Sequence, residues 1–546
     1  MVSDRIAVNG GTPPLARAHT ALVKVQGPFS DRQLESIAAG LEYLRQLGLL
    51  SIIVVDDTSW AERAWRFRAD GSPDDSDADE LLPWVREGMP RAEQLGLAEA
   101  GQRHCMVHEL WRLSHMLASS GADTQPILHP AVRIAGGQAG APGRTPLALD
   151  VPLAHLRAVL EAGKTPIIMP MAHYEDDSAL RCVCVSADDV MVALARALSS
   201  AAEGSTHLSL PPARLMVISR EGGVPSHARA GNPHLSINLA SEHAAIHATF
   251  AWHDTHPRAL AHLDMVRDCL AYMPSTSSGV LATHRSPRSL IANLITNKAA
   301  HSPSLPFRLL ARRSDIQHTP TIVRAGLPVH VLLRWEDVDE EKLRRLLEQS
   351  FGQRVAPAYF ARVAARLECV VVIGDYDGVA IVTNEQASGD AAPIAYLDKF
   401  AVLPKLQGSG AVDFLWAALH DEVQGLGMTD ALNNNGGRGG FGIGRDLVWK
   451  SRADNPVNRW YFERCSGYMR QRIGGRDWVV FWCDAEDRLA RLAGRYVAAA
   501  SGAAGHPQLA RLAPGAPATL PIIADAEAGR LVRWTQCLAQ IPSAWA

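Results

Sequence analysis

The N-terminal half of the chain alternates continuous apolar segments with amphipathic segments of helical period. The clearest example is ALVKV from Ala21, followed by a helical segment at 31–48 and by LSIIVVDD at 50–57. Strands that are apolar at every position are buried on both faces, and they occur in parallel sheets that helices cover on both sides. The pattern repeats less cleanly to about residue 325 and predicts an α/β domain with a mostly parallel sheet.

A chain of 546 residues is too long for one hydrophobic core. Single cores stop growing near about 250–300 residues, so at least two domains are expected. The formal net charge of −3 provides no bulk attraction to nucleic acid or to an anionic membrane. The 8 cysteines include no Cys-x-x-Cys pair, which favours free thiols in a reducing compartment. No segment approaches the roughly 18 apolar residues of a membrane span, so we expect a soluble protein.

We place a domain boundary near residue 325, where a short strand leads into a charged helix. Residues 1–20 are interpreted as a flexible tail that makes a poor mitochondrial presequence, 21–325 as the first domain, 326–490 as the second, and 491–546 as a linker with a C-terminal helix. Short turns join the early strands of the second domain, which favours an antiparallel meander followed by inserted helices. The expected elements there and beyond are helices at 336–350, 357–367, 410–424, 455–464 and 524–540, and strands at 368–378, 379–385, 394–403, near 447–451 and at 477–483.

The segment YLDKFAVLPKLQGSG at 396–410 is typical of a strand that ends in a glycine-rich turn and leads into a helix. Small residues let a ligand approach the main chain, and the free N–H groups at a helix start bind phosphate. The residues that could do so are Gly408, Ser409 and Gly410, with Gln407 and Lys405 beside them. The turn predicts a pyrophosphate site of the kind that an acyltransferase using coenzyme A needs. The alternative is an ordinary strand-to-helix turn.

Cationic side chains occur near this turn and in the segment 449–462. Lys399 lies on the strand that leads to the turn, while Lys450 and Arg452 stand two positions apart in an extended segment and therefore share one face. A substrate with two carboxylates would suit this array, because the guanidinium of arginine binds one carboxylate through two hydrogen bonds. Arg354 is a weaker candidate for the same pocket. The alternative is solvated surface charge.

Asn455 and Tyr461 are the candidate catalytic side chains. They are six positions apart, nearly two helical turns, so both could lie near one face of a helix. A phenol can give its proton to a departing thiolate. Each residue also has a structural explanation, because Asn before a Pro is a common helix cap and an aromatic run such as WYF is common in a core.

Other motifs argue against rival chemistries. GRGGFG at 437–442 satisfies G-x-G-x-x-G but has no strand before it and no amphipathic helix after it, so we interpret it as a flexible insertion. The many histidines, among them His243 and His247, include no HExxH pair and no neighbouring Cys, so no zinc or other metal is expected. No G-x-S-x-G motif is present, which leaves serine hydrolase chemistry without a nucleophile.

Several strings resemble N-acetylglutamate synthases of the fungal type, in which an amino-acid-kinase-like domain precedes an N-acetyltransferase domain of the GNAT fold. The acetyltransferase strings are YLDKF, QGSG, LVWKSRADNPVNRWYF and DWVVFWC, in the order of the family. The strings SREGGVPS, INLASEH, YMPSTSSGVL, HSPSLP and VRAGLPV resemble the N-terminal domain. The resemblance covers about residue 20 to the C-terminus. It implies an α/β fold, with a parallel-sheet sandwich followed by a mixed α/β acetyltransferase domain.

This resemblance implies acetyl transfer from acetyl-CoA to the α-amino group of L-glutamate, the first step of L-arginine biosynthesis, in the mitochondrial matrix. It also implies feedback inhibition by L-arginine, a homo-oligomer, and association with acetylglutamate kinase. Carried onto this chain, the resemblance assigns glutamate binding to four side chains, Lys399, Lys450, Arg452 and Asn455, and protonation of the leaving thiolate to Tyr461. It assigns the pantetheine arm to the backbone around Val402 and Leu403. The pyrophosphate is assigned to the turn Gln407, Gly408, Ser409 and Gly410.

The chain departs from the family pattern at three places. Lys405 stands where the family turn usually carries Arg or Gln, and Leu406 stands where it carries a Gly. Lys450 stands where Arg is common in animal relatives. In the kinase-like domain Lys24 is kept, but Gln26 replaces the first glycine of a Lys-x-Gly-Gly turn and adds a side chain where phosphates approach. We therefore expect no kinase turnover.

Three alternatives stay open at this point. The chain could be a non-catalytic, arginine-sensing partner of acetylglutamate kinase, which would bind arginine but release no thiol from acetyl-CoA. It could acetylate another acidic amine, because the cations alone do not distinguish among acidic substrates. It could also be an active acetylglutamate kinase, which Gln26 disfavours.

Overall fold

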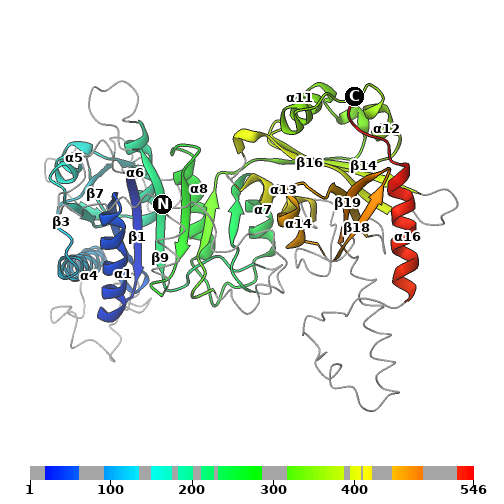
Figure 1. Ribbon diagram of the computed structural model, residues 1–546. Coiled ribbons are helices and arrows are strands. Elements are labelled where there is room, and N and C mark those ends of the chain that lie inside the picture. The colour runs from blue at the N-terminus through cyan, green and yellow to red at the C-terminus, as the bar shows by residue number, and fades with distance from the viewer. Residues whose placement is uncertain are drawn as a thin grey trace, which may run out of the picture.

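The computed structural model describes residues 19–60, 91–134, 149–174, 182–200, 211–226, 231–285, 316–386, 394–406, 410–420, 446–465, 467–483 and 525–546. Within these ranges the chain forms two large sheets that lie side by side, each with helices packed against it (Figure 1). No helix within them is both long and apolar enough to cross a membrane. The cysteines are free thiols, as predicted.

The first large sheet has eight strands in the order β10-β12-β11-β9-β1-β2-β6-β3. Its neighbouring strands run parallel except for the antiparallel pair β11 and β12. The strands are β1 (His19–Gly27), β2 (Leu49–Asp57), β3 (Thr124–Ile127), β6 (Thr165–Ile168), β9 (Pro212–Ser219), β10 (Ser236–Asn238), β11 (Ser278–Ala282) and β12 (Thr321–Arg324). The predicted, mostly parallel sheet is confirmed. β1 already begins at His19, inside the tail predicted for residues 1–20.

Helices cover both faces of this sheet, as the apolar strands predicted. Successive residues of β1 point to opposite faces, so Val23 packs in one core with α1 (Asp31–Gln46) and α4 (Arg91–Ser119), whereas Leu22 packs in the other with α6 and α8. The helices on the second side are α5 (Leu153–Glu161), α6 (Ala187–Ser200), α7 (Leu239–Thr249) and α8 (Ala259–Leu270). A smaller sheet of four strands, β5 (Leu149–Asp150), β4 (Val132–Ile134), β7 (Met171–Tyr174) and β8 (Cys182–Cys184), completes this part.

A buried lysine near the carboxyl end of β1 joins three elements. The side chain of Lys24 is 0% exposed, and its Nζ pairs with Asp188 at the start of α6 and lies 2.9 Å from Asp56 Oδ2 at the end of β2. Arg258 also pairs with Asp188, at 3.1 Å. A buried charge is tolerated only when such partners replace the lost water.

Gln26 fills the position where a kinase turn would have a glycine. Its side chain is buried, and Nε2 of His262 donates a hydrogen bond to its Oε1. Burial, with Lys24 and Arg258 nearby, lowers the pKa of His262, so its ring stays neutral. The side chain of Gln26 is therefore part of the protein's packing at this end of β1, and the expected lack of kinase turnover stays a prediction.

The second large sheet has seven strands in the order β13-β14-β15-β16-β17-β19-β18. Its neighbours are antiparallel except for β16 and β17, which are parallel. The strands are β13 (Val329–Leu332), β14 (Leu367–Ile373), β15 (Gly378–Glu385), β16 (Ile394–Val402), β17 (Leu447–Arg452), β18 (Gly467–Ile473) and β19 (Arg476–Cys483). The predicted meander of β14, β15 and β16 is confirmed. β18 was not predicted, because it is largely polar and exposed.

Four helices flank this sheet on its two faces. α11 (Glu340–Phe351) and α12 (Tyr359–Ala365) lie on one face, and α13 (Ala411–His420) and α14 (Asn458–Phe462) lie on the other (Figure 1). Short 3-10 turns occur at η3 (Trp335–Asp337) and η4 (Pro404–Leu406). The chain passes from the first sheet to the second between Arg324 of β12 and Val329 of β13. We keep the division at 325/326 as a proposal.

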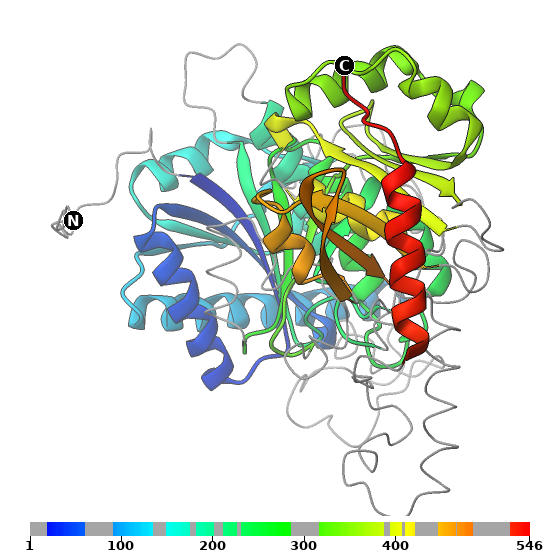
Figure 2. The same ribbon diagram turned by 45° about the vertical axis from the view of Figure 1, so that its right-hand side comes forward.

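The C-terminal helix α16 (Asp525–Gln540) packs along the second sheet rather than extending away from it (Figures 1 and 2). Trp534 of α16 lies 5.4 Å, ring to ring, from Trp482 of β19. The last residues then reach the turn between α11 and α12, where the N–H of Ala546 donates to the carbonyl of Arg354 at 3.0 Å. The C-terminus is therefore part of the second domain's packing.

The Lys24 ion pairs generate a stability prediction. Lys24→Ala leaves Asp56 without its buried partner, and breaking a buried pair typically costs about 3–5 kcal/mol. The free energy of unfolding from denaturant titration should fall by this amount. Arg32→Ala, at an exposed position of α1, is the control and should change it by less than about 0.5 kcal/mol. Equal effects of the two variants would contradict a structural role for the Lys24 pairs.

Candidate functional site

Strands β16 and β17 pair only at their beginnings. The register joins Ala395 to Leu447 and Tyr396 to Val448, after which no further pairs form between them in the described residues. β16 nevertheless continues to Val402, paired with β15, and β17 continues with β19 as its partner. The two strands therefore separate within an otherwise continuous sheet. We call residues 397–402 and 449–452 the divergent segment.

The divergent segment presents unpaired main-chain groups of β16. The N–H of Leu403 donates to the carbonyl of Asp377 at 3.0 Å, on the β15 side. N–H directions alternate along a strand, so the N–H of Val402 points away from β15 and toward the divergent segment. Of the two backbone positions predicted for the pantetheine arm, Val402 has its N–H directed toward the divergent segment, whereas the N–H of Leu403 is bonded to Asp377. The prediction of these two positions stays a prediction.

The divergent segment contains a β-bulge at Asp398, next to Lys399. Ile381 pairs with Lys399 and Val382 with Leu397, which leaves Asp398 as the extra residue. The Nζ of Lys399 donates to the carboxylate of Asp398 at 3.1 Å and to its carbonyl at 2.9 Å. Because Lys399 pairs with Ile381, which packs in the core under α11 and α12, its side chain lies on that face of the sheet.

Asp398 is the centre of a buried network that sequence reasoning missed. Its side chain is 2% exposed and accepts hydrogen bonds from the Tyr359 hydroxyl at 2.6 Å and from Arg362 at 2.8 Å, both on α12. Burial alone would raise the pKa of Asp398. The charges of Lys399 and Arg362 outweigh that effect and hold the pKa below its ordinary value. Asp398 is thus an anion that fixes two cations.

Lys450 extends from β17 toward the same face. Its Nζ donates to the carbonyl of Leu538 in the last turn of α16 at 2.7 Å and lies 5.2 Å from the centre of the Trp478 ring. Burial lowers the pKa of Lys450 to about 8, with Asp398 acting in the opposite direction and Lys399 adding to the decrease. Lys450 therefore belongs to the same charged cluster as Lys399, and it also caps the carboxyl end of α16.

The C-terminal tail covers part of this cluster. The Nζ of Lys399 lies 5.6 Å from the ring centre of Trp545 and 5.0 Å from that of Tyr359. Arg354, predicted as a weaker substrate ligand, is exposed, and its carbonyl pairs with the tail. The main chain of Arg354 contacts the tail that covers the cluster, whereas no hydrogen bond or ion pair in the described residues joins its side chain to Asp398.

The remaining predicted ligands on β17 and α14 have different surroundings. Arg452 is 60% exposed at the end of β17, with its Nε 3.6 Å from Asp454. The side-chain amide of Asn455 donates to Ser451 Oγ at 3.0 Å, and its Oδ1 accepts from the N–H of Val457 at 3.1 Å. Asn455 therefore stabilises the turn before α14, which is the structural alternative considered for it.

Tyr461 lies on the opposite face of the sheet from Lys450. Its ring is buried 5.4 Å from the rings of Trp449 and Phe481. Trp449 precedes Lys450 on β17, and neighbouring residues of a strand face opposite sides. Burial raises the pKa of Tyr461, so its hydroxyl keeps its proton. The ring is part of the core, as the structural alternative proposed, and the hydroxyl is protonated.

The glycine turn is described only in part. Gln407, Gly408 and Ser409 lie outside the described residues, as does the insertion predicted at 437–442. Gly410 has φ +91°, and a Cβ there would lie 2.7 Å from Nη1 of Arg324. The left-handed backbone conformation therefore favours glycine before α13, whereas the flexible side chain of Arg324 could move away from a Cβ.

Arg324 comes from the first sheet and places a cation at the beginning of α13. It lies on β12, in the string VRAGLPV, which the sequence indicated as part of the family resemblance and as a domain boundary but not as a functional site. Lys405, predicted to assist the turn, is 70% exposed and lies 3.3 Å from Asp377. Lys405 is therefore at the surface, whereas Arg324 approaches the main chain of the turn.

Comparison with known proteins assigns the family. A family model described as the N-acetyltransferase of N-acetylglutamate synthase matches residues 330–434 and 443–493. The mitochondrial amino-acid acetyltransferase of Laccaria bicolor is 44% identical over 538 residues, which cover 96% of this chain and 85% of the relative. This chain belongs to the mitochondrial amino-acid acetyltransferase family. The resemblance inferred from the sequence strings is confirmed, and so is the assignment as an acyltransferase.

A second relative and a solved structure are also similar to this chain. The relative from Coprinopsis cinerea is 42% identical over 563 residues, covering 98% of this chain and 80% of the relative. A crystal structure of N-acetylglutamate synthase from Neisseria gonorrhoeae, complexed with coenzyme A and N-acetyl-glutamate, aligns with 87% of this chain at 16% identity and a TM-score of 0.48. Residues 435–442, which contain the glycine run, fall between the two segments that match the family model.

The Asp398 network generates a prediction for stability and its pH dependence. Asp398→Asn leaves Lys399 without its buried anion and leaves Arg362 with Glu385 alone, so it should lower the free energy of unfolding by about 3–5 kcal/mol at pH 7. Because the folded pKa lies below the ordinary value of about 3.9, this stabilisation is complete above pH 4 and is lost as the pH falls through the folded pKa. Denaturant titrations at several pH values measure it.

The control for this prediction is Asp454→Asn, the same substitution at an exposed ion pair. It should change the free energy of unfolding by less than about 1 kcal/mol at every pH. A wild-type-like Asp398→Asn protein would contradict the structural role assigned to Asp398.

Proposed function

We propose that the protein transfers the acetyl group of acetyl-CoA to the α-amino group of L-glutamate. The observation that supports this best is the divergent segment, which separates a cluster of cations on one face of the sheet from a protonated tyrosine on the other. A thioester held between the two strands can receive an amine from the first face and release a thiolate toward the second. The names of the relatives support an amino acid as acceptor.

Glutamate is the proposed acceptor because of the positive charge on the face of the second sheet that α11 and α12 cover, which we call the first face. Lys399, Arg362 and Lys450 surround Asp398. Arg362 also pairs with the buried carboxylate of Glu385, which Arg366 contacts as well. Among the described residues, four cations therefore face two buried carboxylates within this cluster. The excess positive charge suits an amino acid with two carboxylates. Arg452 is proposed to add a bidentate contact from the end of β17, where its exposure leaves the guanidinium accessible.

Acetyl-CoA is proposed to lie along β16. Val402 offers a main-chain N–H to the pantetheine arm, as an added strand would require. Gln407, Gly408, Ser409 and Gly410 are proposed to hold the pyrophosphate at the beginning of α13. Arg324, whose guanidinium lies against Gly410, adds a positive charge there. The relative from Neisseria gonorrhoeae was crystallised with coenzyme A, which agrees with this cosubstrate.

The proposed mechanism is direct transfer, with glutamate's amine attacking the thioester carbonyl. Lys399 and Lys450 hold the carboxylates so that the deprotonated amine points into the divergent segment. The N–H of Val402 donates to the oxygen that becomes negative as the new C–N bond forms. Tyr461 gives its phenolic proton to the sulfur as the C–S bond breaks, and its raised pKa keeps that proton in place beforehand. The nitrogen loses one proton to water as the amide forms, and the tyrosinate takes a proton back from water, which restores the phenol.

The proposal extends to the cellular role. The relatives are named mitochondrial, and we infer action in the mitochondrial matrix, at the first step of L-arginine biosynthesis. We infer L-arginine as a feedback inhibitor acting through the first domain, a homo-oligomeric assembly, and association with acetylglutamate kinase. These points depend on the family resemblance.

A thiol-release assay tests the proposed function. Purified protein is incubated with acetyl-CoA and glutamate, aspartate or glutamine, with and without arginine. The proposal predicts rapid thiol release with glutamate, much slower release with the other two, and a lower rate with arginine. No amino-acid-dependent release would refute catalysis and favour the arginine-sensing partner, whereas equal rates with all three would refute the choice of glutamate.

Tyr461→Phe tests the proton donor. Loss of a general acid typically costs about 10²–10⁴ in rate, so kcat should fall by this factor while KM for glutamate changes little. Tyr468→Phe, at an exposed tyrosine of β18, is the matched control and should keep the wild-type kcat. An unchanged kcat in Tyr461→Phe would remove this hydroxyl from the mechanism.

Lys450→Arg tests whether the positive charge of Lys450 binds glutamate, because the two side chains lose their charge at different pH. Since the pKa of Lys450 is about 8, its positive charge is present at pH 7 and is lost as the pH rises to 9. Arginine stays charged, so the ratio of wild-type to variant KM for glutamate should rise roughly tenfold over this range. Titration of the substrate cancels in this ratio. Lys405→Arg, at an exposed lysine, should give a flat ratio, and a flat ratio for Lys450→Arg would contradict its proposed role.

A further inference from the structure

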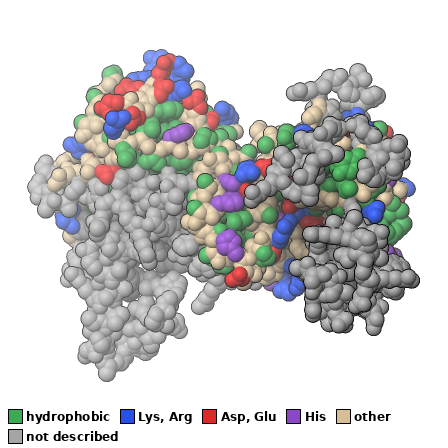
Figure 3. Space-filling model, turned by 180° about the vertical axis from the view of Figure 1, so that it is seen from behind, with side chains coloured by type: hydrophobic (Ala, Val, Ile, Leu, Met, Phe, Trp, Pro, Cys, Tyr) green, Lys and Arg blue, Asp and Glu red, His purple; other side chains and the backbone are tan. Residues whose placement is uncertain are grey.

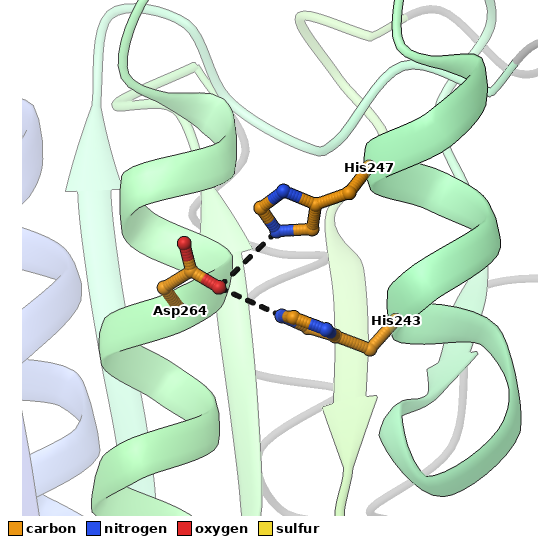
Figure 4. A group of neighbouring side chains, drawn as sticks. All are labelled: His243, His247 and Asp264. Carbon is orange, nitrogen blue, oxygen red and sulfur yellow. Dashed lines mark hydrogen bonds and ion pairs between the residues drawn. The ribbon is translucent and has the colours of Figure 1, made fainter.

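Helices α7 and α8 of the first domain bring together three side chains that commonly bind metals. His243 and His247 come from α7 and Asp264 from α8, and both imidazoles point at the same carboxylate (Figure 4). Nε2 of His243 lies 2.7 Å, and Nε2 of His247 3.1 Å, from Oδ1 of Asp264. The three potential ligand atoms all lie within 4.8 Å of one another.

The backbone holds these ligands in place. Residues four apart on a helix lie one above the other, so the spacing of His243 and His247 makes them a chelating pair. Ile246 of α7 and Leu263 of α8 are buried in the same hydrophobic core, which fixes the helices that carry the ligands. The three ligand side chains are themselves partly exposed, so an ion can reach them from solvent. Histidines gather on the face of the molecule shown in Figure 3.

An arginine already brings positive charge to this cluster. Nη1 of Arg267 lies 3.2 Å from Nε2 of His243 and 3.4 Å from Oδ1 of Asp264. Arg267 also pairs with Asp268 at 2.8 Å, and its side chain is nearly half exposed. It can therefore keep Asp268 as a partner while leaving the cluster. Arg267 behaves as a competitor for the position that a metal ion would take.

We propose that His243, His247 and Asp264 form a binding site for a zinc-like divalent transition metal, with water as the fourth ligand and with Arg267 as a competing cation. Two imidazoles and a carboxylate suit zinc, cobalt, nickel or copper rather than magnesium or calcium, which prefer oxygen ligands. Tetrahedral zinc with bonds of about 2.0–2.1 Å places its ligand atoms about 3.3 Å apart. From 2.7 Å and 3.1 Å, the separations from Asp264 need to widen by about 0.6 Å and about 0.2 Å. The two imidazole nitrogens, which lie within 4.8 Å of each other, have to reach the same spacing.

The sequence analysis did not predict this site. The absence of an HExxH pair led us to expect no zinc, but the two histidines of α7 have the same four-residue spacing without the glutamate between them. The glutamate of that motif serves catalysis, whereas the two histidines alone hold the ion. The third ligand comes from another helix, which sequence spacing could not show. The site lies in the first domain and is independent of the proposed acetyl transfer.

Metal titration of the full-length protein tests the proposal. The protein is prepared without a histidine tag, stripped with a chelator and titrated calorimetrically with ZnCl₂, while Co²⁺ reports tetrahedral coordination through its visible absorption. We expect one site in the wild type. His247→Gln and Asp264→Asn should each weaken zinc affinity about tenfold or more. Arg267→Gln should strengthen it several-fold, because the competing charge is removed.

The control is His155→Gln, at an exposed histidine of α5 outside the cluster, which should bind zinc as the wild type does. Thermal unfolding confirms that each variant is folded. Wild-type affinity in both His247→Gln and Asp264→Asn would overturn the site. Weaker binding in Arg267→Gln would overturn the competition, because a loss of affinity means that Arg267 supports the ion rather than opposing it.

Discussion

The separation of β16 from β17 is the constraint on which the rest of the acetyltransferase domain depends. Parallel strands normally continue to pair, because unpaired N–H and C=O groups at a sheet edge lose hydrogen bonds. Here β16 is held by β15 and β17 by β19, so each strand keeps one partner and can lose the other. The resulting break exposes a main-chain edge inside the sheet, in addition to the outer edges at β13 and β18.

Buried charge explains how the first face is maintained beside this break. The bulge at Asp398 puts a carboxylate where α12 can supply Tyr359 and Arg362, and Lys399 joins it from the same strand. Lys450 is held from the far end of the chain by a carbonyl of α16. The cations are therefore fixed before any substrate arrives, which reduces the cost of ordering them on binding. The C-terminal helix is part of this arrangement, although residues 525–546 lie outside the segments that match the family model.

The sequence allowed the order of elements and the family to be predicted, because these depend on local pattern. Continuous apolar strands predicted the parallel sheet, and strings such as YLDKF and NPVNRWYF identified the family. The sequence did not show that Lys450 meets Leu538, 88 positions later, or that Arg324 approaches Gly410 from another sheet. It also concealed the role of Asp398, because a bulge depends on the register between two strands. Contacts distant in sequence decide these features, and no local pattern reports them.

Crystallographic electron density for the protein in complex with coenzyme A and N-acetylglutamate tests the central claim most directly. The account predicts pantetheine between β16 and β17, with a hydrogen bond to the N–H of Val402, and the carboxylates of N-acetylglutamate on the side of Lys399 and Lys450. Coenzyme A bound elsewhere, or strands β16 and β17 paired along their full length with the ligands present, would contradict it.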